Sequence, residues 1–215
     1  MCHGDRPRKI LLNSWEGVYF DINESKMAAM MRDIASLGGE LFVMDDGWFG
    51  DKYRRDNESV ALGDWVADRR KLPGGIKALT DSARKAGVGF GLWLEPEMAD
   101  ISSEIYEKHP DWIVKAAGRE PVTGRGGAQV VLDFSNPRVR DHVVATVDRI
   151  LKENPLIEYV KWDCNSGIYQ HGSQYLPKDR QSHLNIAWHR GLEEVLSRIR
   201  EKYPDLTVQA LSLIH

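Results

Sequence analysis

The feature that most constrains the fold of this chain is the alternation of short apolar runs with longer amphipathic stretches. Apolar runs that we expect to form strands lie at residues 10–15, 40–46, 88–94, 129–134, 159–163 and 206–210. The stretches between them repeat apolar residues every three or four positions, as a helix with one buried face does. Strands that alternate with helices are typical of parallel sheets built from βα units. The pattern therefore predicts an α/β chain.

Residues that favour helix ends support the predicted helices. These helices are expected at 24–38, 74–87, 136–155 and 181–202. Gly38 ends the first, and glycine is common just after a helix C-terminus. Asn136 can cap the third, with Pro137 at the first helical position. The fourth should end before Pro204, because proline cannot continue a helix.

Polar clusters follow four of the predicted strands, and they decide between two kinds of α/β sheet. They are "NSWEG" at 13–17, "DDGWFG" at 45–50, "EPEM" at 95–98 and "DCNSG" at 163–167. A (β/α)8 barrel builds its active site at these carboxyl ends, whereas a dinucleotide-binding sheet would show a glycine-rich fingerprint after its first strand. The sequence therefore predicts a (β/α)8 TIM barrel.

The number of strands indicates that this barrel is truncated. A complete barrel has eight strands in typically about 250 residues, and the 215-residue chain offers six candidates at most. Residues 129–134 are also compatible with an irregular connection, which would leave five. We therefore expect five or six βα units, and an open barrel of this kind exposes two strand edges.

Composition excludes several classes of function. Lys and Arg number 29 against 32 Asp and Glu, so no basic field for nucleic acid is expected. No apolar run approaches the roughly 18 residues of a membrane span. Cys2 and Cys164 follow no metal or disulfide spacing, which fits a reducing cytoplasm. None of the seven histidines ends a predicted strand, so a His-ligated metal is not expected.

The most informative segment is "YVKWDCN" at 159–165. Side chains alternate faces along a strand, so Lys161, Asp163 and Asn165 should point one way and Trp162 and Cys164 the other. We expect Lys161 to pair with Asp163 and to keep it ionised. An ionised aspartate at a strand end can act as a nucleophile, and a purely structural buried ion pair is the alternative.

A second candidate lies in "DDGWFG", where adjacent carboxylates repel each other unless a substrate, a cation or an arginine satisfies them. Asp45 and Asp46 end a strand, and Gly47 allows a tight turn. Trp48 adds an apolar ring and a donor, which suits the alternating CH and OH surfaces of a sugar. The alternative is a solvated turn, a common role for this composition.

The segments "GLWLEPEM" and "TGRGGAQ" supply further candidates. Trp93 is expected in the pocket, with Glu95 and Glu97 in supporting roles. Arg125 lies in a glycine-rich loop without phosphate-loop spacing, and it could bind an anion or sugar hydroxyls or simply be solvated.

Five motifs agree with one family in order and spacing. These are "NSWEG", "DDGWFG", "GLWLEPEM", "GRGGAQ" with "LDFSNP", and "KWDCN". Together they resemble the retaining α-galactosidases of glycoside hydrolase family 36. The resemblance implies hydrolysis of terminal α-galactosyl residues from small oligosaccharides such as raffinose and melibiose. It also implies that no metal or organic cofactor is needed and that the full-length enzyme is a homo-oligomer.

The resemblance assigns roles residue by residue. Asp163 would be the nucleophile that forms a covalent galactosyl-enzyme. Asp45 and Asp46 would bind outer hydroxyls, and Lys161 and Arg125 other sugar oxygens. The full set of implied substrate contacts is Trp15, Asp45, Asp46, Trp48, Trp93, Arg125, Lys161 and Asn165.

Retaining hydrolysis also needs a second carboxyl group, about 5–5.5 Å from the first. In the family this acid/base follows a later Cys/Ser/Gly-rich segment, which the chain lacks, so we expect the chain alone to be inactive. Residues 1–9 are expected to be a linker remnant, 10–210 the partial barrel, and "LSLIH" at 211–215 a non-native tail.

Two other functions remain open at this point. One is a galactose-binding module without catalysis. The other is a magnesium enzyme that uses oxygen ligands from Asp45, Asp46, Glu95 and Asp163. Within the family reading, the preference for galactose or N-acetylgalactosamine and the choice between hydrolysis and transfer also stay open.

Overall fold

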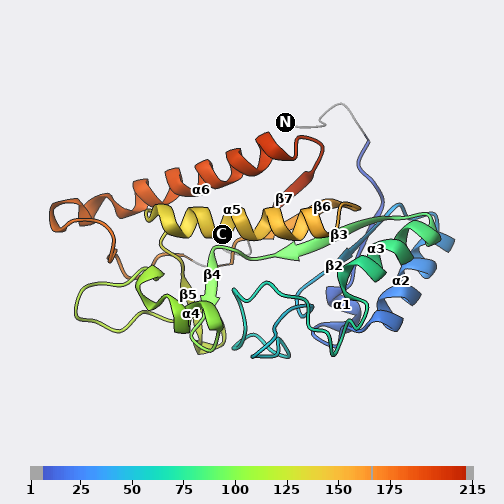
Figure 1. Cartoon of the computed structure of the whole chain (residues 1–215), viewed down its shortest axis with the longest axis horizontal. Coiled ribbons are helices and arrows are strands. Elements are labelled where there is room, and N and C mark those ends of the chain that lie inside the picture. Colours follow the sequence, from blue (N-terminus) through green and yellow to red (C-terminus); the bar gives the residue numbers. More distant parts are fainter. Residues whose placement is uncertain (1–6, 166, 212–215) are drawn as a thin grey trace.

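The computed structural model of this chain describes residues 7–165 and 167–211 and is built around one parallel sheet (Figure 1). Its five strands lie in the order β1-β2-β3-β6-β7, and every neighbouring pair is parallel. The strands are β1 Leu11–Asn13, β2 Leu41–Met44, β3 Gly89–Leu94, β6 Ile157–Asp163 and β7 Thr207–Leu211. Residues 1–6 of the expected linker remnant and 212–215 of the expected tail lie outside the described residues.

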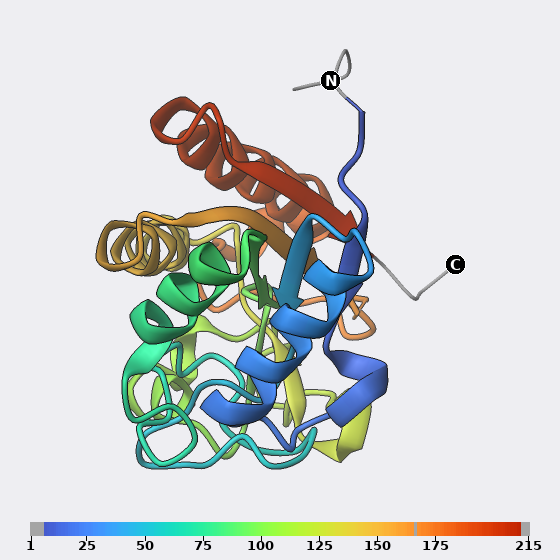
Figure 2. The same ribbon diagram turned by 90° about the vertical axis from the view of Figure 1, so that its right-hand side faces the viewer.

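Four long helices connect consecutive strands of this sheet. They are α2 Glu24–Ser36, α3 Gly75–Ala86, α5 Pro137–Glu153 and α6 Leu184–Lys202. Because each helix leads to the next parallel strand in the same direction, right-handed crossovers place all four on the same side. Figure 2 shows the helices as an outer layer around a curled sheet. The fold is therefore an α/β half-barrel.

Shorter elements complete the chain. They are α1 Trp15–Val18, β4 Met98–Asp100, α4 Glu104–Lys108, η1 Pro110–Trp112, η2 Arg125–Gly127, β5 Gln129–Val131 and η3 Lys178–His183. Strands β4 and β5 pair antiparallel in a separate two-stranded sheet. The expected strand at 129–134 is therefore an irregular connection between β3 and α5 and adds no strand to the main sheet. Residues 129–131 pair with β4, which follows the turn at Pro96, and the backbone N of Asp133 donates to the carbonyl of Trp112.

The predicted helix ends are largely confirmed. Asn136 caps α5, accepting from the backbone N of Arg138 at 3.0 Å, and Pro137 is the first helical residue. Gly38 follows α2 with φ 82°. The helix expected from 181 starts at Leu184 instead, because Gln181 lies in the 3-10 turn η3 and bonds to the preceding loop, donating to the carbonyl of Ser173.

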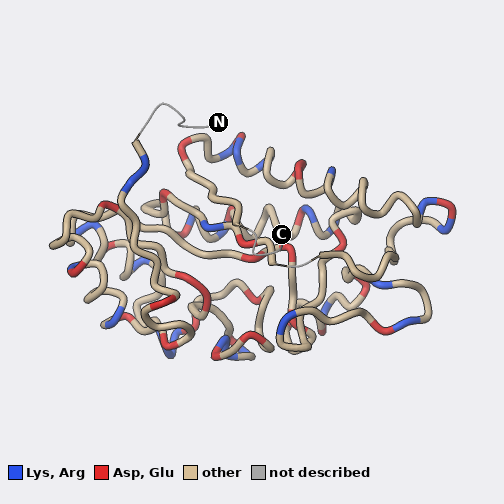
Figure 3. Tube along the Cα trace, turned by 180° about the vertical axis from the view of Figure 1, so that it is seen from behind, with Lys and Arg blue, Asp and Glu red and all other residues tan. Residues whose placement is uncertain are grey.

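The two edges of the sheet are exposed, as expected for an open barrel. Leu11 on β1 is 38% exposed and Val208 on β7 is 40% exposed. Over the described residues, Lys and Arg are interspersed with Asp and Glu along the whole trace (Figure 3). In the same part of the chain, every helix is too short or too polar to span a bilayer.

Candidate active site

The carboxyl ends of the parallel strands bring distant polar residues to one edge of the sheet. Asn13 ends β1, Asp45 follows β2, Glu95 follows β3, and Asp163 ends β6. Parallel strands present these ends at the same edge, where barrel enzymes place their catalytic groups. The four polar clusters that the sequence placed after strands therefore lie together.

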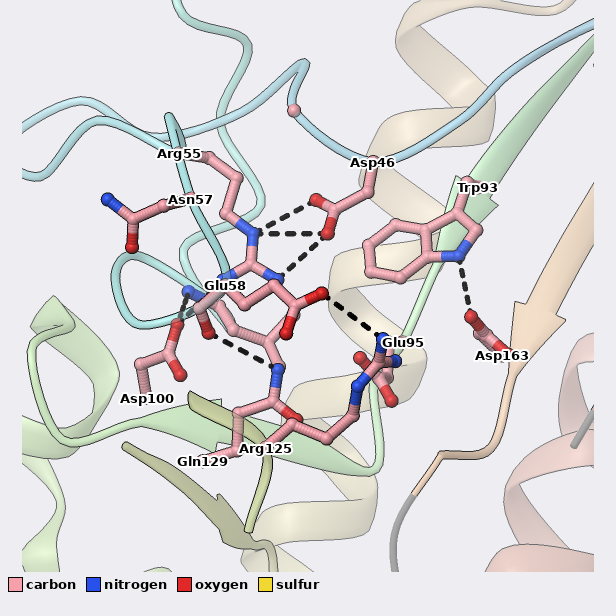
Figure 4. A network of polar contacts seen from close by, with 12 residues as sticks. Asp46, Arg55, Asn57, Glu58, Trp93, Glu95, Asp100, Arg125, Gln129 and Asp163 are labelled. Atoms are coloured by element: carbon pink, nitrogen blue, oxygen red, sulfur yellow. Dashed lines mark hydrogen bonds and ion pairs between the residues drawn. The ribbon is translucent and has the colours of Figure 1, made fainter. Parts of the chain in front are cut away.

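Asp163 is held by donors on both of its carboxylate oxygens. Trp93 Nε1 donates to Oδ2 at 3.0 Å, and the backbone N of Cys164 donates to Oδ1 at 3.2 Å. Figure 4 shows the indole of Trp93, on β3, directed at the carboxylate of Asp163, on β6. These two contacts fix the orientation of the carboxylate at the strand end.

The predicted ion pair between Lys161 and Asp163 is wrong, because Lys161 pairs with Asp45. Lys161 Nζ lies 2.7 Å from Asp45 Oδ2, and Asn13 Nδ2 donates to the same oxygen at 2.6 Å. Lys161 precedes Asp163 by two residues, about 6–7 Å along the strand. The curl of the sheet brings the end of β2 within reach of the lysine, so Asp45 takes this charge.

The opposite face of β6 follows the predicted alternation. Trp162 Nε1 and Cys164 Sγ both donate to Glu97 Oε1, at 2.7 and 3.2 Å. Burial raises the pKa of Glu97, and these two donors oppose the rise. Glu97 therefore supports β6 from the face away from Lys161 and Asp163.

Asp46 is paired with Arg55, which no sequence motif indicated. Arg55 Nε lies 2.9 Å from Asp46 Oδ1, and Nη2 lies 2.8 Å from Oδ2. Burial raises the pKa of Asp46, and the charge of Arg55 works against that rise. Arg55 lies in "DKYRRDNES", which resembles a solvated loop. The only sequence feature that indicated such a partner is the pair of adjacent carboxylates, Asp45 and Asp46, which repel each other unless a cation lies nearby.

Glu95 is a buried carboxyl group between other acids. It is 1% exposed, and Oε1 accepts from the backbone N of Asn165 at 3.2 Å. Burial first, and then the charges of Asp163 and Asp46, raise the pKa of Glu95 to about 8. Glu95 is therefore mostly protonated at neutral pH, and Asn165 lies beside it, 5% exposed.

The three candidate tryptophans occupy different environments. Trp15 is half-buried and packs edge-on against Tyr19 and Phe20, with ring centroids 5.1 Å apart in both pairs. Trp93 is buried and contacts Asp163, as described above. Trp48 is fully buried, and its Nε1 donates to the carbonyl of Trp93 at 3.0 Å. Trp48 therefore packs behind Trp93, and a direct contact with a sugar would require the core to open.

Arg125 lies on η2 in the glycine-rich loop and is partly exposed. Its Nη2 lies 3.2 Å from Glu58 Oε1, and both side chains are about 40% exposed. Figure 4 shows Arg125 and Glu58 facing each other across the gap between two loops. Arg125 is therefore partly solvated and forms an exposed ion pair with Glu58.

The carboxylates of the site are each paired with separate groups. Asp45 contacts Lys161, and Asp46 contacts Arg55. Over residues 7–165 and 167–211, no three His, Cys, Asp or Glu side chains are grouped so that they could hold a metal ion. The magnesium alternative therefore lacks a ligand cluster in the described part of the chain.

The sequence of this chain is similar to those of known α-galactosidases. The sequence model of the Melibiase family matches residues 2–213. The α-galactosidase AgaA of Geobacillus stearothermophilus is 43% identical over 208 residues, and Mel36A of Lactobacillus acidophilus is 37% identical over 208 residues. Each alignment covers 97% of this chain and 28% of the relative.

Solved structures agree with these sequence relatives. The crystal structure of the GH36 α-galactosidase AgaA superposes with a TM-score of 0.91 at 42% identity, covering 97% of this chain and 28% of AgaA. The α-galactosidase of Lactobacillus brevis gives the same TM-score at 36% identity, covering 96% of this chain and 27% of that enzyme. This chain thus spans little more than a quarter of the proteins it matches. It belongs to the melibiase family.

Proposed function

We propose that this chain is part of the catalytic (β/α)8 barrel of a longer retaining α-galactosidase, called the parent enzyme below. The parent would cleave terminal α-galactosyl residues from raffinose- and melibiose-type oligosaccharides. The observation that carries the proposal is the position of Asp163, held by Trp93 at the strand edge where Asp45 and Asp46 also lie. Variants of the relative AgaA have been crystallised with stachyose and with raffinose, which supports this substrate class.

In this proposal Asp163 is the nucleophile. An oxygen of its carboxylate attacks the anomeric carbon, the glycosidic C–O bond breaks, and a second carboxyl group protonates the leaving oxygen. Water then attacks the same carbon and releases galactose, while the second carboxyl group takes the proton from the water. Asp45 and Asp46 are not assigned to the acid role, because their oxygens are engaged by Lys161 and Arg55.

The remaining residues are proposed to bind the sugar. Asp45 and Lys161 offer an acceptor and a donor at one point of the edge, and both side chains are mostly buried. Trp15, which is half-buried, offers a ring surface for the apolar CH face of galactose, and the buried Trp93 is proposed to act on the site through its hydrogen bond to Asp163. Asp46 accepts from the outer hydroxyls, and Asn165 and Arg125 contact other oxygens. No metal or organic cofactor takes part in this proposal.

The test is the replacement Asp163→Asn in the parent enzyme, assayed with an aryl α-galactoside. Turnover should be abolished, because the amide cannot attack the anomeric carbon. Added azide should restore part of the rate. Asp141→Asn, an exposed position on α5, is the matched control and should leave turnover unchanged. Substantial activity of Asp163→Asn without azide would contradict the proposal.

Three further expectations belong to the same proposal. The chain by itself should hydrolyse little substrate, because general acid help contributes about 10²–10⁴-fold in rate. The parent is proposed to be a homo-oligomer. A cytoplasmic location is proposed because Cys2 and Cys164 follow no disulfide spacing in the sequence.

A further inference from the structure

A single buried guanidinium lies between carboxylates from different parts of the fold. Arg55 is 1% exposed, and Asp46 and Asp100 are 5% and 0% exposed. Figure 4 shows Arg55 between these two carboxylates, with Asp46 on the side of Trp93 and Asp163. Burying a charge carries a large desolvation penalty, which is offset only by good geometry and further hydrogen bonds. The contacts of Arg55 provide both.

The contact between Arg55 and Asp46 is bidentate. Nε lies 2.9 Å from Asp46 Oδ1, and Nη2 lies 2.8 Å from Oδ2. Two parallel hydrogen bonds from a planar guanidinium fix a carboxylate in direction as well as in position. A lysine at this position would keep the charge but lose the planar pair of bonds. The geometry therefore determines how Asp46 is turned toward the strand edge.

The other side of Arg55 is attached to the small antiparallel sheet. Nη1 lies 2.8 Å from Asp100 Oδ2 and 2.9 Å from the carbonyl oxygen of Val60. The backbone N of Leu62 donates to the same oxygen of Asp100 at 2.9 Å. Asp100 ends β4, whose register with β5 is fixed by backbone pairing with Gln129. Asp100 therefore holds Arg55 from the small antiparallel sheet, which lies outside the main sheet and its strand edge.

We propose that Arg55, held in place by Asp100, is a positioning residue that sets the orientation of Asp46 for the hydroxyl groups of a galactosyl substrate. The inference rests on the proposed function, because it concerns the same sugar-binding site. It adds a chain of contacts that runs from Asp100 on β4 through Arg55 to Asp46 at the site. Arg55 itself is not proposed to touch the sugar.

The charges around Arg55 agree with this role. The charge of the neighbouring Asp45 raises the pKa of Asp46, and the charge of Asp46 in turn raises the pKa of Glu95. Burial raises the pKa of Asp100 to about 6, although Arg55 counteracts the rise. Removing the guanidinium would leave Asp46 and Asp100 without their shared cation, and a protonated Asp46 would present an O–H donor and lose the charge that strengthens its hydrogen bonds from hydroxyl groups. Lys71 Nζ donates to the backbone carbonyl of Arg55 and forms an ion pair with Asp56 at 2.8 Å.

The experiment compares Arg55→Lys with wild type in the parent enzyme. It measures kcat and KM for an aryl α-galactoside and the inhibition constant of free galactose. We expect KM and the inhibition constant of galactose to rise together by about 10–100-fold, because a small displacement of a binding group weakens binding by that much. The change in kcat should be smaller. Arg84→Lys on the exposed face of α3 is the matched control and should change neither constant.

A second variant keeps the test decisive if Arg55→Lys does not fold. Asp100→Asn preserves the shape of the side chain but removes the charge that holds Arg55, so both constants should rise in the same direction by a smaller factor. A loss of folded enzyme lowers the apparent kcat and leaves KM unchanged. That result in both variants would overturn the inference.

A double variant tests whether Arg55 acts through Asp46. Asp46→Asn combined with Arg55→Lys should bind galactose no more weakly than Asp46→Asn alone, because the second change acts on a group already altered. Additive effects would overturn the inference. An inactive wild-type parent would overturn the proposed function and the inference together. An active parent whose KM is unchanged in Arg55→Lys would overturn the inference alone.

Discussion

Trp93 links the core of the half-barrel to the proposed nucleophile through one side chain. Its Nε1 donates to Asp163, and its backbone carbonyl accepts from Trp48 Nε1. The ring also lies in an aromatic cluster with Phe49 and Trp65, at centroid distances of 6.2 and 6.0 Å. Packing behind Trp93 therefore limits the directions from which its N–H can approach the carboxylate.

Replacing this tryptophan tests the value of the hydrogen bond to the nucleophile. Trp93→Phe in the parent enzyme removes the donor, and a hydrogen bond to a charged group contributes about 1.5–3 kcal/mol. We therefore expect kcat/KM for an aryl α-galactoside to fall by about 10–150-fold. Trp188→Phe on α6 is the matched control, because Trp188 Nε1 donates to the backbone carbonyl of Leu132 at 2.8 Å, and it should lower thermal stability with little effect on kcat/KM. Equal kinetic losses in both variants would contradict the role given to Trp93.

Glu95 predicts a dependence of stability on pH. The folded pKa of Glu95 is about 8, against 4.5 for an ordinary glutamate. Between these values the unfolded chain has released the proton and the folded chain still binds it, so stability is lost as pH rises from about 4.5 to 8. Glu95→Gln cannot ionise, and in the parent enzyme its urea midpoint should therefore gain on wild type between pH 5 and pH 8.

The control for this pH dependence is another glutamate with a different environment. Hydrogen bonds from Lys52 and Tyr53 lower the pKa of Glu107, so the folded chain holds no extra proton there as pH rises. The urea midpoint of Glu107→Gln relative to wild type should stay flat over the same range. A flat difference for Glu95→Gln as well would show that the buried carboxyl is already ionised.

The sequence predicted which residues lie at the strand ends, but it did not predict their partners. Alternation along one strand placed Trp162 and Cys164 on the face opposite Asp163, and both bond to Glu97. The partner of Lys161 depends on the curl of the sheet and on the order of β2, β3 and β6, which are properties of distant segments. The local sequence pattern therefore predicts which face of the strand a side chain occupies, but it does not predict which distant residue that side chain contacts.

At the scale of elements, the turn after β2 places both Asp45 and Asp46. Gly47 has φ 107°, which L side chains rarely adopt, and a Cβ there would lie 3.1 Å from the Cα of Phe20. The sequence predicted this turn because glycine after two aspartates is a recognisable signal. The path of the following residues to Arg55 was not predictable, because a polar loop carries no periodicity.

Gly47→Ala tests this turn in the parent enzyme. The positive φ and the contact with Phe20 should together lower the free energy of unfolding by more than about 2 kcal/mol. Gly118→Ala is the matched control, since Gly118 has φ 72° but nothing within 4 Å of the added Cβ. It should cost only about 1–2 kcal/mol. Urea unfolding of both variants provides the comparison, and equal losses would mean that the contact with Phe20 is relieved.

The strands illustrate what periodicity can and cannot predict about elements. Five predicted strands form the sheet. The central strands β2 and β3 are the nearly continuous apolar runs expected of buried parallel strands, whereas the edge strands β1 and β7 are partly exposed. The run at 129–134 has the same composition, yet β5 pairs with β4 instead. Burial determines composition, whereas pairing is determined by the turn at Pro96 and by the length of the connection. The apolar run at 129–134 therefore predicted correctly that these residues are buried, but it did not predict that they pair in the small sheet.

At the scale of the whole molecule, the sheet is open at both edges. In the described residues β1 pairs only with β2, and β7 only with β6. Unpaired backbone groups at a sheet edge are a template for another chain, particularly where apolar side chains are exposed. The 215-residue chain expressed by itself should therefore self-associate more than an ordinary globular protein of its size.

Val208→Lys in the 215-residue chain tests whether the β7 edge drives this self-association. Val208 is 40% exposed on β7, and a lysine on an edge strand opposes edge-to-edge pairing because identical charges meet across the contact. Light scattering during size exclusion should show a smaller associated fraction than in the wild-type chain. Val122→Lys is the matched control, because Val122 is 47% exposed in a loop away from the main sheet. If both substitutions reduce association equally, added charge is the cause, and pairing at the β7 edge is not.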